Sequence, residues 1–229
     1  MGKNKIQRFA ELHTFPNVIE VELEEVFGKN HPLKGKWNEQ RFKNINPIIL
    51  ELGCGKGEYT VAMAASYPSK NFIGIDIKGN RLWVGARQAL SENLSNVCFL
   101  RTRIDFIESF FAPNEVEEIW ITFPDPQPQS NRKRKRLISP MFLNRYKSFL
   151  KPGGIVHLKT DNEQLYAYTL EVIENNRLML LAATDNLYQS PYRHELAGQI
   201  QTFYEKMFLA EGKPIYYLRF TLDHAERII

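Results

Sequence analysis

The sequence predicts an α/β fold in which a mostly parallel sheet carries helices on both faces. From residue 48 onward, short apolar segments of strand length alternate with longer segments of helical periodicity. The first apolar segment, residues 48–52, runs directly into a glycine-rich turn, which is typical of such folds. A chain of 229 residues, of which 43% are hydrophobic and 24% charged, can bury the core that this sheet requires.

Seven strands and six helices are expected after residue 47. The strands are residues 48–52, 71–75, 97–100, 118–122, 155–160, 178–183 and 216–222. The helices are residues 59–67, 79–94, 106–111, 140–150, 163–175 and 202–211. Ser139 is the expected N-cap of the helix at 140–150, with Pro140 at its first position, and residues 151–154, Lys-Pro-Gly-Gly, are expected to form the turn that ends it.

Residues 1–47 mix charged and aromatic residues without a clear period. Within them, residues 18–27 are expected to form either a strand or a short helix. We interpret residues 1–47 as an N-terminal extension packed on the core, with its very start disordered, and residues 48–229 as a single domain.

The composition also argues against several protein classes. The N-terminal basic residues are not followed by the apolar segment of a secretory signal, and no stretch is apolar enough to span a bilayer. The two cysteines, Cys54 and Cys98, provide neither a disulfide framework nor metal-ligand spacing, and the five histidines show no such spacing either. We therefore expect a cytoplasmic protein with no membrane partner and no metal, either a monomer or a homodimer.

The glycine-rich turn predicts a nucleotide-type cofactor site. Glu51 precedes Gly53, Gly55 and Gly57, and a second acid, Asp76, ends the next strand, where it could accept the hydroxyls of a ribose. This G-x-G-x-G spacing differs from the dinucleotide fingerprint. A carboxylate beside the turn would repel a pyrophosphate but suits an ammonium and a sulfonium charge, which favours S-adenosylmethionine over a nicotinamide cofactor. The alternative is that both acids merely end their strands.

A second feature follows the strand at 118–122, which runs into Phe123-Pro124-Asp125-Pro126. The two prolines restrict the backbone on both sides of Asp125 and would hold it at the carboxyl edge of the sheet, where ligands bind in open α/β folds. The alternative is an exposed turn aspartate.

Five consecutive basic residues, 132–136, follow soon after this segment, in a chain whose net charge is only +4. An isolated basic run is most often a solvated surface. Close to Asp125 it would instead form a phosphate-binding platform, whose contacts position a nucleic acid without reading its sequence.

Taken in order, these motifs resemble the bacterial tRNA (guanine-N7-)-methyltransferase family. They are Glu-Leu-Gly-Cys-Gly-Lys-Gly at 51–57, Phe-Pro-Asp-Pro at 123–126 with the basic cluster after it, Lys-Thr-Asp-Asn at 159–162 and Thr-Phe-Tyr-Glu at 202–205. The resemblance extends from about residue 34 to residue 222. It implies a Rossmann-like class I methyltransferase fold with a mostly parallel seven-stranded sheet. It also implies methyl transfer from S-adenosylmethionine to N7 of a guanine in the tRNA variable loop.

The resemblance also implies roles for individual residues. The expected cofactor-binding residues are Glu51, Gly53, Gly55, Asp76, Asp105 and Asp125. Asp125 is in addition the expected catalytic acid, beside both cofactor and guanine. The expected substrate-binding residues are Gln129, Arg132, Asp161, Thr202, Phe203, Tyr204 and Glu205.

Several positions depart from the family pattern. Gln127 stands where the family has Trp and Gln129 where it has Lys, and the Arg and His of the following stretch are Asn131 and Arg132 here. Arg103 stands where the family tends to have an acid, so that Asp105 is the candidate substitute there. These departures keep open a catalytically silent tRNA-binding protein on the same fold. A nucleic-acid methyltransferase with another target atom, such as an exocyclic amine, is a further alternative, and a nicotinamide oxidoreductase is a more distant one.

Overall fold

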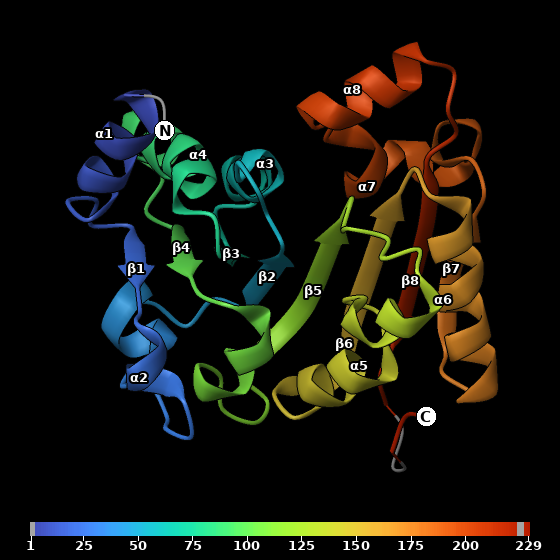
Figure 1. Ribbon diagram of the computed structural model, residues 1–229, viewed down its shortest axis with the longest axis horizontal. Coiled ribbons are helices and arrows are strands. Elements are labelled where there is room, and N and C mark those ends of the chain that lie inside the picture. Colours follow the sequence, from blue (N-terminus) through green and yellow to red (C-terminus); the bar gives the residue numbers. More distant parts are fainter. Residues whose placement is uncertain (1–2, 224–226) are drawn as a thin grey trace. The chain divides into compact units, whose positions relative to one another are not determined.

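The computed structural model describes residues 3–223 and 227–229. The chain divides into two compact units, Met1–Ala112 and Pro113–Ile229, each with a four-stranded portion of sheet and its own helices (Figure 1). Strands and helices alternate in both units, so the predicted α/β class is confirmed. The assignment of residues 48–229 to a single domain stays a prediction.

The first unit contains a wholly parallel set of strands in the order β1-β4-β3-β2. These are β1 (Val18–Glu20), β2 (Ile48–Leu52), β3 (Asn71–Asp76) and β4 (Val97–Arg101). All five residues of β2 are buried, as is typical of a strand covered on both faces. The three strands predicted here are confirmed within one residue at their ends. Because parallel strands share an edge, β2 and β3 bring Glu51 and Asp76 to the same end of the sheet.

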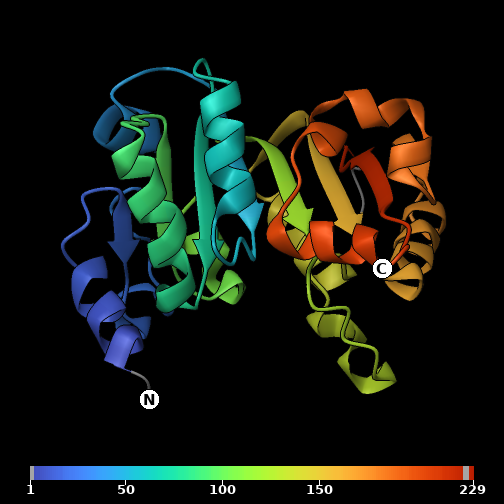
Figure 2. The same ribbon diagram turned by 90° about the horizontal axis from the view of Figure 1, so that it is seen from above.

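The helices of the first unit are mostly α-helices. They are α1 (Lys3–Leu12), α2 (Leu23–Val26), the π-helix η1 (Trp37–Phe42), α3 (Glu58–Ser66), α4 (Gly79–Ser91) and the 3₁₀ helix η2 (Ile104–Ser109). α4 packs against both α1 and α3, and α3 and α4 lie side by side in Figure 2. The helix predicted at 59–67 is confirmed one residue earlier, and the helix predicted at 79–94 is confirmed but ends three residues sooner. The segment predicted at 106–111 forms the tighter η2.

The N-terminal region is more regular than its sequence indicates. Residues 18–27 form both a strand and a short helix, β1 and α2, where the sequence left the choice open. β1 extends the sheet by pairing in parallel with β4, and Trp37 of η1 is fully buried, with its indole N–H donating to the Phe110 carbonyl at 2.8 Å. The predicted disorder concerns the very start of the chain, where residues 1–2 lie outside the described residues.

The second unit has a mixed set of strands in the order β5-β6-β8-β7. β5 (Val116–Thr122) is parallel to β6 (Leu150–Thr160), while β8 (Tyr216–Thr221) is antiparallel to both β6 and β7 (Leu180–Thr184). The longer helices are α5 (Pro140–Lys147), α6 (Glu163–Asn175) and α8 (Phe203–Ala210). The second unit therefore has one parallel and two antiparallel pairings. Together with the three parallel pairings of the first unit, they fit the prediction of a mostly parallel sheet.

One local prediction in the second unit is wrong and another is confirmed. Residues 151–154 belong to β6 rather than to a separate turn: the ladder with β5 shifts register there, and the Gly153 N–H donates to the Asp223 carboxylate at 2.7 Å. Ser139 occupies the predicted N-cap position, with Pro140 as the first residue of α5. Its hydroxyl donates to the Arg134 carbonyl at 2.9 Å and makes no capping bond.

The polar stretch between β7 and α8, predicted as a loop, contains three short helices. They are η4 (Leu187–Gln189), η5 (Pro191–His194) and α7 (Leu196–Gln199). Leu187 and Ala197 are buried, so this stretch is packed as part of the second unit. Among the described residues, no helix is both long enough and apolar enough to cross a membrane.

Candidate functional site

The glycine turn after β2 has the backbone that its sequence requires. Gly53, Gly55 and Gly57 have φ angles of +72°, +57° and +71°, a region that L side chains rarely adopt. The Gly53 N–H donates to the Ile75 carbonyl at 2.8 Å, which fastens the turn to β3. A Cβ on Gly57 would lie 2.5 Å from the Phe99 ring, whereas a Cβ on Gly55 would meet nothing within 4 Å. Gly57 therefore serves packing, and the space beside Gly55 is open to a ligand.

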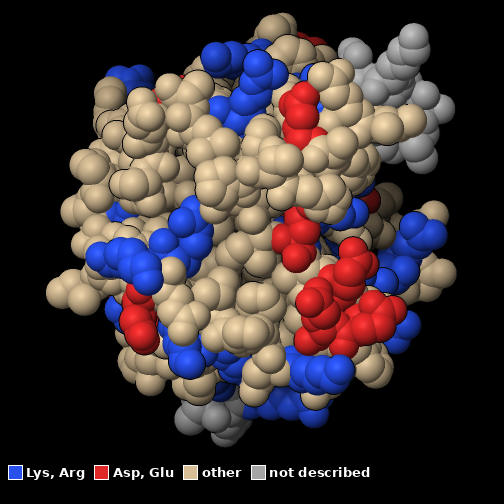
Figure 3. Space-filling model, turned by 90° about the vertical axis from the view of Figure 1, so that its left-hand side faces the viewer, with Lys and Arg blue, Asp and Glu red and all other residues tan. Residues whose placement is uncertain are grey.

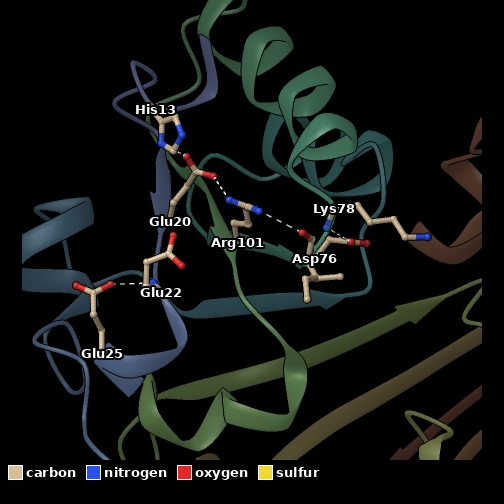
Figure 4. A network of polar contacts seen from close by, with 8 residues as sticks. His13, Glu20, Glu22, Glu25, Asp76, Lys78 and Arg101 are labelled. Atoms are coloured by element: carbon tan, nitrogen blue, oxygen red, sulfur yellow. Dashed lines mark hydrogen bonds and ion pairs between the residues drawn. The ribbon is translucent and has the colours of Figure 1, made fainter. Parts of the chain in front are cut away.

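Two carboxylates lie at this turn. Glu51 is only 2% exposed and accepts a short hydrogen bond from the Thr60 hydroxyl of α3. Asp76 accepts the Gly55 N–H with one oxygen, at 2.9 Å. Its other oxygen accepts the Lys78 N–H at 2.8 Å (Figure 4). Asp76 thus shapes the glycine turn directly. Each of its oxygens keeps a further lone pair with which it could accept a ligand hydroxyl.

Both carboxylates affect the thiol pKa of Cys54, the residue between Gly53 and Gly55. Burial raises the pKa of its thiol well above the ordinary value, and the negative charges of Glu51 and Asp76 raise it further. A thiol in this environment stays protonated and is a poor nucleophile.

An arginine that the sequence did not identify stabilises the segment after Asp76. Arg101, at the end of β4, donates to the Glu20 carboxylate of β1 at 2.8 Å and to the Ile77 carbonyl at 3.4 Å (Figure 4). His13 contacts the other oxygen of Glu20, with 2.5 Å between Nδ1 and Oε2. The N-terminal region is thereby connected to the residue after Asp76. The alternation of strands carries no signal for this contact, because β1 lies far from β4 in sequence.

Asp105, the candidate substitute for the missing family acid, lies in η2. Its carboxylate accepts two hydrogen bonds from Arg103, at 3.1 and 3.2 Å, and both side chains are more than a third exposed. A cavity of about 180 Å³ lies next to Arg103, between the segment 21–26 on one side and Ile77 with residues 101–103 and Phe106 on the other. Arg103 lines this cavity, so the residue that departs from the family pattern stands at a space that could receive a ligand.

The loop after β5 holds Asp125 at the end of its strand. Phe123 and Gln127 adopt left-handed backbone conformations, with φ of +48° and +44°, which are costly for residues with side chains. The Phe123 N–H donates to the Lys159 carbonyl at 2.7 Å, and the Gln127 N–H donates to the Asp125 carboxylate at 3.0 Å. Asp125 itself is exposed. The loop is therefore constrained by more than its two prolines.

The basic run divides into two parts. Residues 132–135 lie in the 3₁₀ helix η3 (Ser130–Lys135) and are exposed, and Gln129 occupies the N-cap position of that helix. Arg136, by contrast, is only 5% exposed. In Figure 2 the yellow-green segment that contains η3 projects from the rest of its own unit, which leaves its exposed cations accessible to a large anion.

The charge of the remaining surface is mixed. The sequence carries 30 Lys and Arg against 26 Asp and Glu, and on the face shown in Figure 3 basic and acidic side chains form separate groups. Net charge alone therefore gives weak attraction to a polyanion, and that attraction has to come from local groups such as η3.

The segment Thr202–Glu205 begins α8. The Thr202 hydroxyl accepts the Glu205 N–H at 3.2 Å, and the Glu205 carboxylate accepts the Thr202 N–H at 3.3 Å, so the two form a capping box. Phe203 and Tyr204 are about half exposed, at 52% and 47%. Asp161, one residue after β6, is half-buried.

Glu205 differs from Phe203 and Tyr204 in that its side chain is completely buried. It forms an ion pair with Lys159 of β6 and accepts a hydrogen bond from the Tyr188 hydroxyl at 2.6 Å. Burial and the bond to Glu205 raise the pKa of Tyr188. Of the four residues predicted to contact substrate here, Phe203 and Tyr204 present exposed side chains, whereas Glu205 anchors the helix. Lys159 belongs to the Lys-Thr-Asp-Asn motif at 159–162, but the motif assigned it no role. A lysine in a buried strand was a usable signal, because a buried charge requires a partner.

No group of three or more His, Cys, Asp or Glu side chains in the described parts of the chain could hold a metal ion. The predicted residues are thus divided between the two units. Glu51, Gly53, Gly55 and Asp76 meet at one turn of the first unit, with Asp105 in the nearby η2. The others belong to loops and the helix start of the second unit: Asp125, Gln129, Arg132, Asp161, Thr202, Phe203, Tyr204 and Glu205.

The fold is that of methyltransferases. The structure of the 16S rRNA methyltransferase KamB superposes with a TM-score of 0.61 at 15% sequence identity, covering 83% of this chain and 94% of that one. The 16S rRNA (adenine(1408)-N(1))-methyltransferase from Catenulisporales acidiphilia gives a TM-score of 0.57 at 12% identity, covering 84% and 95%. The methyltransferase fold predicted from the motifs is confirmed.

Sequence comparison defines the family more narrowly. A family model described as "Putative methyltransferase" matches residues 45–218. The tRNA (guanine-N(7)-)-methyltransferase of Christiangramia forsetii is 53% identical over 96% of this chain and 99% of its own length, and that of Bacteroides thetaiotaomicron is 47% identical over 97% and 87%. The chain belongs to the tRNA (guanine-N(7)-)-methyltransferase family, as the resemblance of its motifs indicated.

Proposed function

We propose that this protein transfers the methyl group of S-adenosylmethionine to N7 of a guanine in the variable loop of tRNA. The observation that carries the proposal is the 53% identity to a tRNA (guanine-N(7)-)-methyltransferase over 96% of the chain. Glu51, Asp76 and Asp125, the acids expected for this chemistry, are all present. Since tRNA would be the substrate, the proposal includes a cytoplasmic location.

The first unit offers a turn that fits the cofactor. The open space beside Gly55 would admit the ligand close to the backbone, and Asp76 would accept ribose hydroxyls with its remaining lone pairs. Glu51 would add negative charge close to the positively charged methionine part. Asp105, held by Arg103 at the edge of the neighbouring cavity, is the candidate for the adenine end. When bound, S-adenosylmethionine supplies a methyl group activated by the sulfonium charge.

Guanine N7 has an available lone pair and no proton at neutral pH, so no general base is needed to make it a nucleophile. The protein's contribution would be alignment of the guanine for an in-line attack, which accounts for a large share of the barrier in reactions between two bound partners. Asp125 would accept hydrogen bonds from the guanine edge and offset the positive charge that develops on the purine. Its constrained loop would keep the carboxylate in place.

The remaining contacts would hold the RNA. Exposed cations of η3, Arg132 among them, would bind phosphates, and the exposed rings of Phe203 and Tyr204 would offer stacking surfaces for a base outside the helical stack. Gln129 and Asp161 would contact the nucleotide, and Thr202 with Glu205 would fix the start of α8.

The test is to incubate the purified protein with S-adenosylmethionine and unmodified tRNA, digest the tRNA and identify methylated nucleosides by mass. Asp125→Ala is assayed alongside, with the exposed Asp185→Ala as a matched control. We expect 7-methylguanosine from the wild type and the control. In Asp125→Ala turnover should fall much more than cofactor affinity.

Other outcomes would contradict the proposal. A different methylated nucleoside would mean another target atom, and tRNA binding without methylation would mean a silent binding protein. Full turnover by Asp125→Ala would remove the role given to that residue. If a nicotinamide cofactor raises the melting temperature and S-adenosylmethionine does not, the proposed cofactor is wrong.

A further inference from the structure

The last residue of the basic run makes contacts different from those expected of a phosphate-binding cation. Arg136 is 5% exposed, and its guanidinium lies over the ring of Tyr168 in α6, 4.4 Å from the ring centre. Its Nε donates to the Pro126 carbonyl at 3.0 Å and its Nη2 donates to the Gln127 carbonyl at 3.2 Å. All of these residues belong to the second unit.

The two carbonyls follow Asp125 directly in the chain. The segment before Asp125 is held by the hydrogen bond from the Phe123 N–H to the Lys159 carbonyl, at 2.7 Å. The segment after it contains Gln127, whose φ of +44° disfavours a residue with a side chain. Such a conformation persists only where its surroundings hold it. The bonds from Arg136 supply that constraint on the downstream side.

An arginine suits this position better than a lysine does. Its planar group offers several N–H donors in a fixed fork, which can reach two successive carbonyls while one face stacks on an aromatic ring. A lysine ammonium is a point charge on a flexible stem and does not combine those contacts.

We propose that Arg136 is a positioning residue for Asp125, whereas the exposed cations before it in η3 meet the RNA. The basic run then has two functions: residues 132–135 provide phosphate contacts, and residue 136 fixes the Pro126 and Gln127 carbonyls so that the carboxylate between Phe123 and Gln127 keeps its orientation. This inference rests on the proposed function, which assigns Asp125 to the guanine.

The test compares Arg136→Lys with the double variant Lys133→Ala/Lys135→Ala in the full chain. Single-turnover methyl transfer is measured with saturating tRNA and S-adenosylmethionine, and tRNA affinity is measured over a range of salt concentrations. For Arg136→Lys we expect a rate about 10- to 100-fold lower, as is usual for a small displacement of a reacting group, with an unchanged salt slope. For the lysine double variant the slope should fall in magnitude by about 1.4 to 1.8, the effect of losing two phosphate contacts.

Hydrogen exchange of individual amides distinguishes a local effect of the substitution from a general loss of stability, which would not be confined to one segment. In Arg136→Lys, the amides of Phe123, Asp125, Gln127 and Gln129, the residues of this segment that are not proline, should exchange faster while those of β5 and β6 keep their protection. If Arg136→Lys fails to fold, Tyr168→Leu removes the ring beneath the guanidinium and should produce the same selective change with a lower rate.

The inference is overturned if Arg136→Lys keeps the wild-type rate. It is also overturned if Arg136→Lys lowers the magnitude of the salt slope by half of the change in the lysine double variant, which is the share of one phosphate contact. Asp125→Asn separates this failure from that of the proposed function. A wild-type rate in Asp125→Asn would remove the role of Asp125 itself. A lost rate in Asp125→Asn with a wild-type rate in Arg136→Lys would remove only the role of Arg136.

Discussion

Lys159 and Glu205 form an ion pair with 2.7 Å between the charged atoms, and neither side chain has any exposed surface. Lys159 lies near the end of β6 and Glu205 in the first turn of α8. The ammonium also donates to the Ile200 carbonyl at 2.9 Å, and the carboxylate accepts the Thr202 N–H. The pair therefore fastens the start of α8, with its exposed aromatic residues, to the sheet of the second unit.

Removal of one partner from this pair should destabilise the protein strongly. Glu205→Ala leaves a buried ammonium without its counter-charge, and such changes cost about 3–5 kcal/mol. Lys159→Met combined with Glu205→Leu removes both charges and should cost less than Glu205→Ala alone. Urea unfolding of the three proteins measures the difference. If Glu205→Ala lowers the free energy of unfolding by less than about 1 kcal/mol, the pair is solvated like a surface pair.

The same substitution should also affect substrate use. Because Glu205 holds α8 rather than the cofactor turn, Glu205→Ala should raise the KM for tRNA while leaving the dissociation constant of S-adenosylmethionine unchanged. Both are measured under conditions where the variant remains folded. A weaker cofactor affinity with an unchanged KM for tRNA would contradict this assignment.

The glycines of the turn should differ sharply in their tolerance of alanine. Gly57→Ala would place a methyl group 2.5 Å from the Phe99 ring and should prevent stable folding. Gly55→Ala meets no atom within 4 Å, so it should fold, with a backbone cost of about 1–2 kcal/mol, and should lose affinity for S-adenosylmethionine. Thermal melting and calorimetric titration separate the two effects. An unchanged cofactor affinity in Gly55→Ala would show that the open space is not used.

Local sequence signals predicted the elements of the core well. Residues 48–52 and 71–75 were recognisable as β2 and β3 because buried strands in a parallel sheet are apolar along most of their length. The glycines at 53, 55 and 57 were recognisable because a left-handed backbone favours glycine strongly. These features depend on neighbouring residues, so they can be read from the chain.

The contacts that the sequence did not indicate join distant residues. β1 was ambiguous because three residues carry little periodicity, and its pairing with β4 spans a long stretch of chain. The role of Arg136 was hidden in a basic run, because composition does not distinguish an exposed cation from one buried against two carbonyls. Glu205 was predicted beside the substrate from a motif, but its contact with Lys159 depends on the packing of α8.

Both cysteines should resist thiol reagents in the folded protein. Burial raises the pKa of Cys54 and of Cys98, so at any given pH their thiolate fraction is lower than that of a free cysteine. At pH 8 the native protein should therefore react with a disulfide reagent far more slowly than the urea-unfolded protein, which should release two equivalents. Rapid reaction of one thiol in the native state would contradict the burial of that residue.

The Glu20–Arg101 contact should contribute more stability than an exposed pair does. The side chains of Arg101 and Glu20 are 30% and 12% exposed, and their atoms lie 2.8 Å apart. Lys151 and Glu117 form a longer pair, at 3.5 Å, and are 43% and 38% exposed. We expect Glu20→Gln to lower the free energy of unfolding by about 1–2 kcal/mol, because it weakens a charged hydrogen bond in a half-buried site.

Lys151→Met is the matched control, and it should change the free energy of unfolding by less than about 0.5 kcal/mol, since exposed pairs contribute little. For a chain of this length, each 1 kcal/mol corresponds to about 2–4 °C in melting temperature, so the two variants are distinguishable by thermal melting. Arg101 also donates to the carbonyl of Ile77, the residue after Asp76, so Glu20→Gln should weaken S-adenosylmethionine binding several-fold as well. Equal melting temperatures for Glu20→Gln and Lys151→Met, with unchanged cofactor affinity, would show that β1 contributes nothing to the cofactor turn.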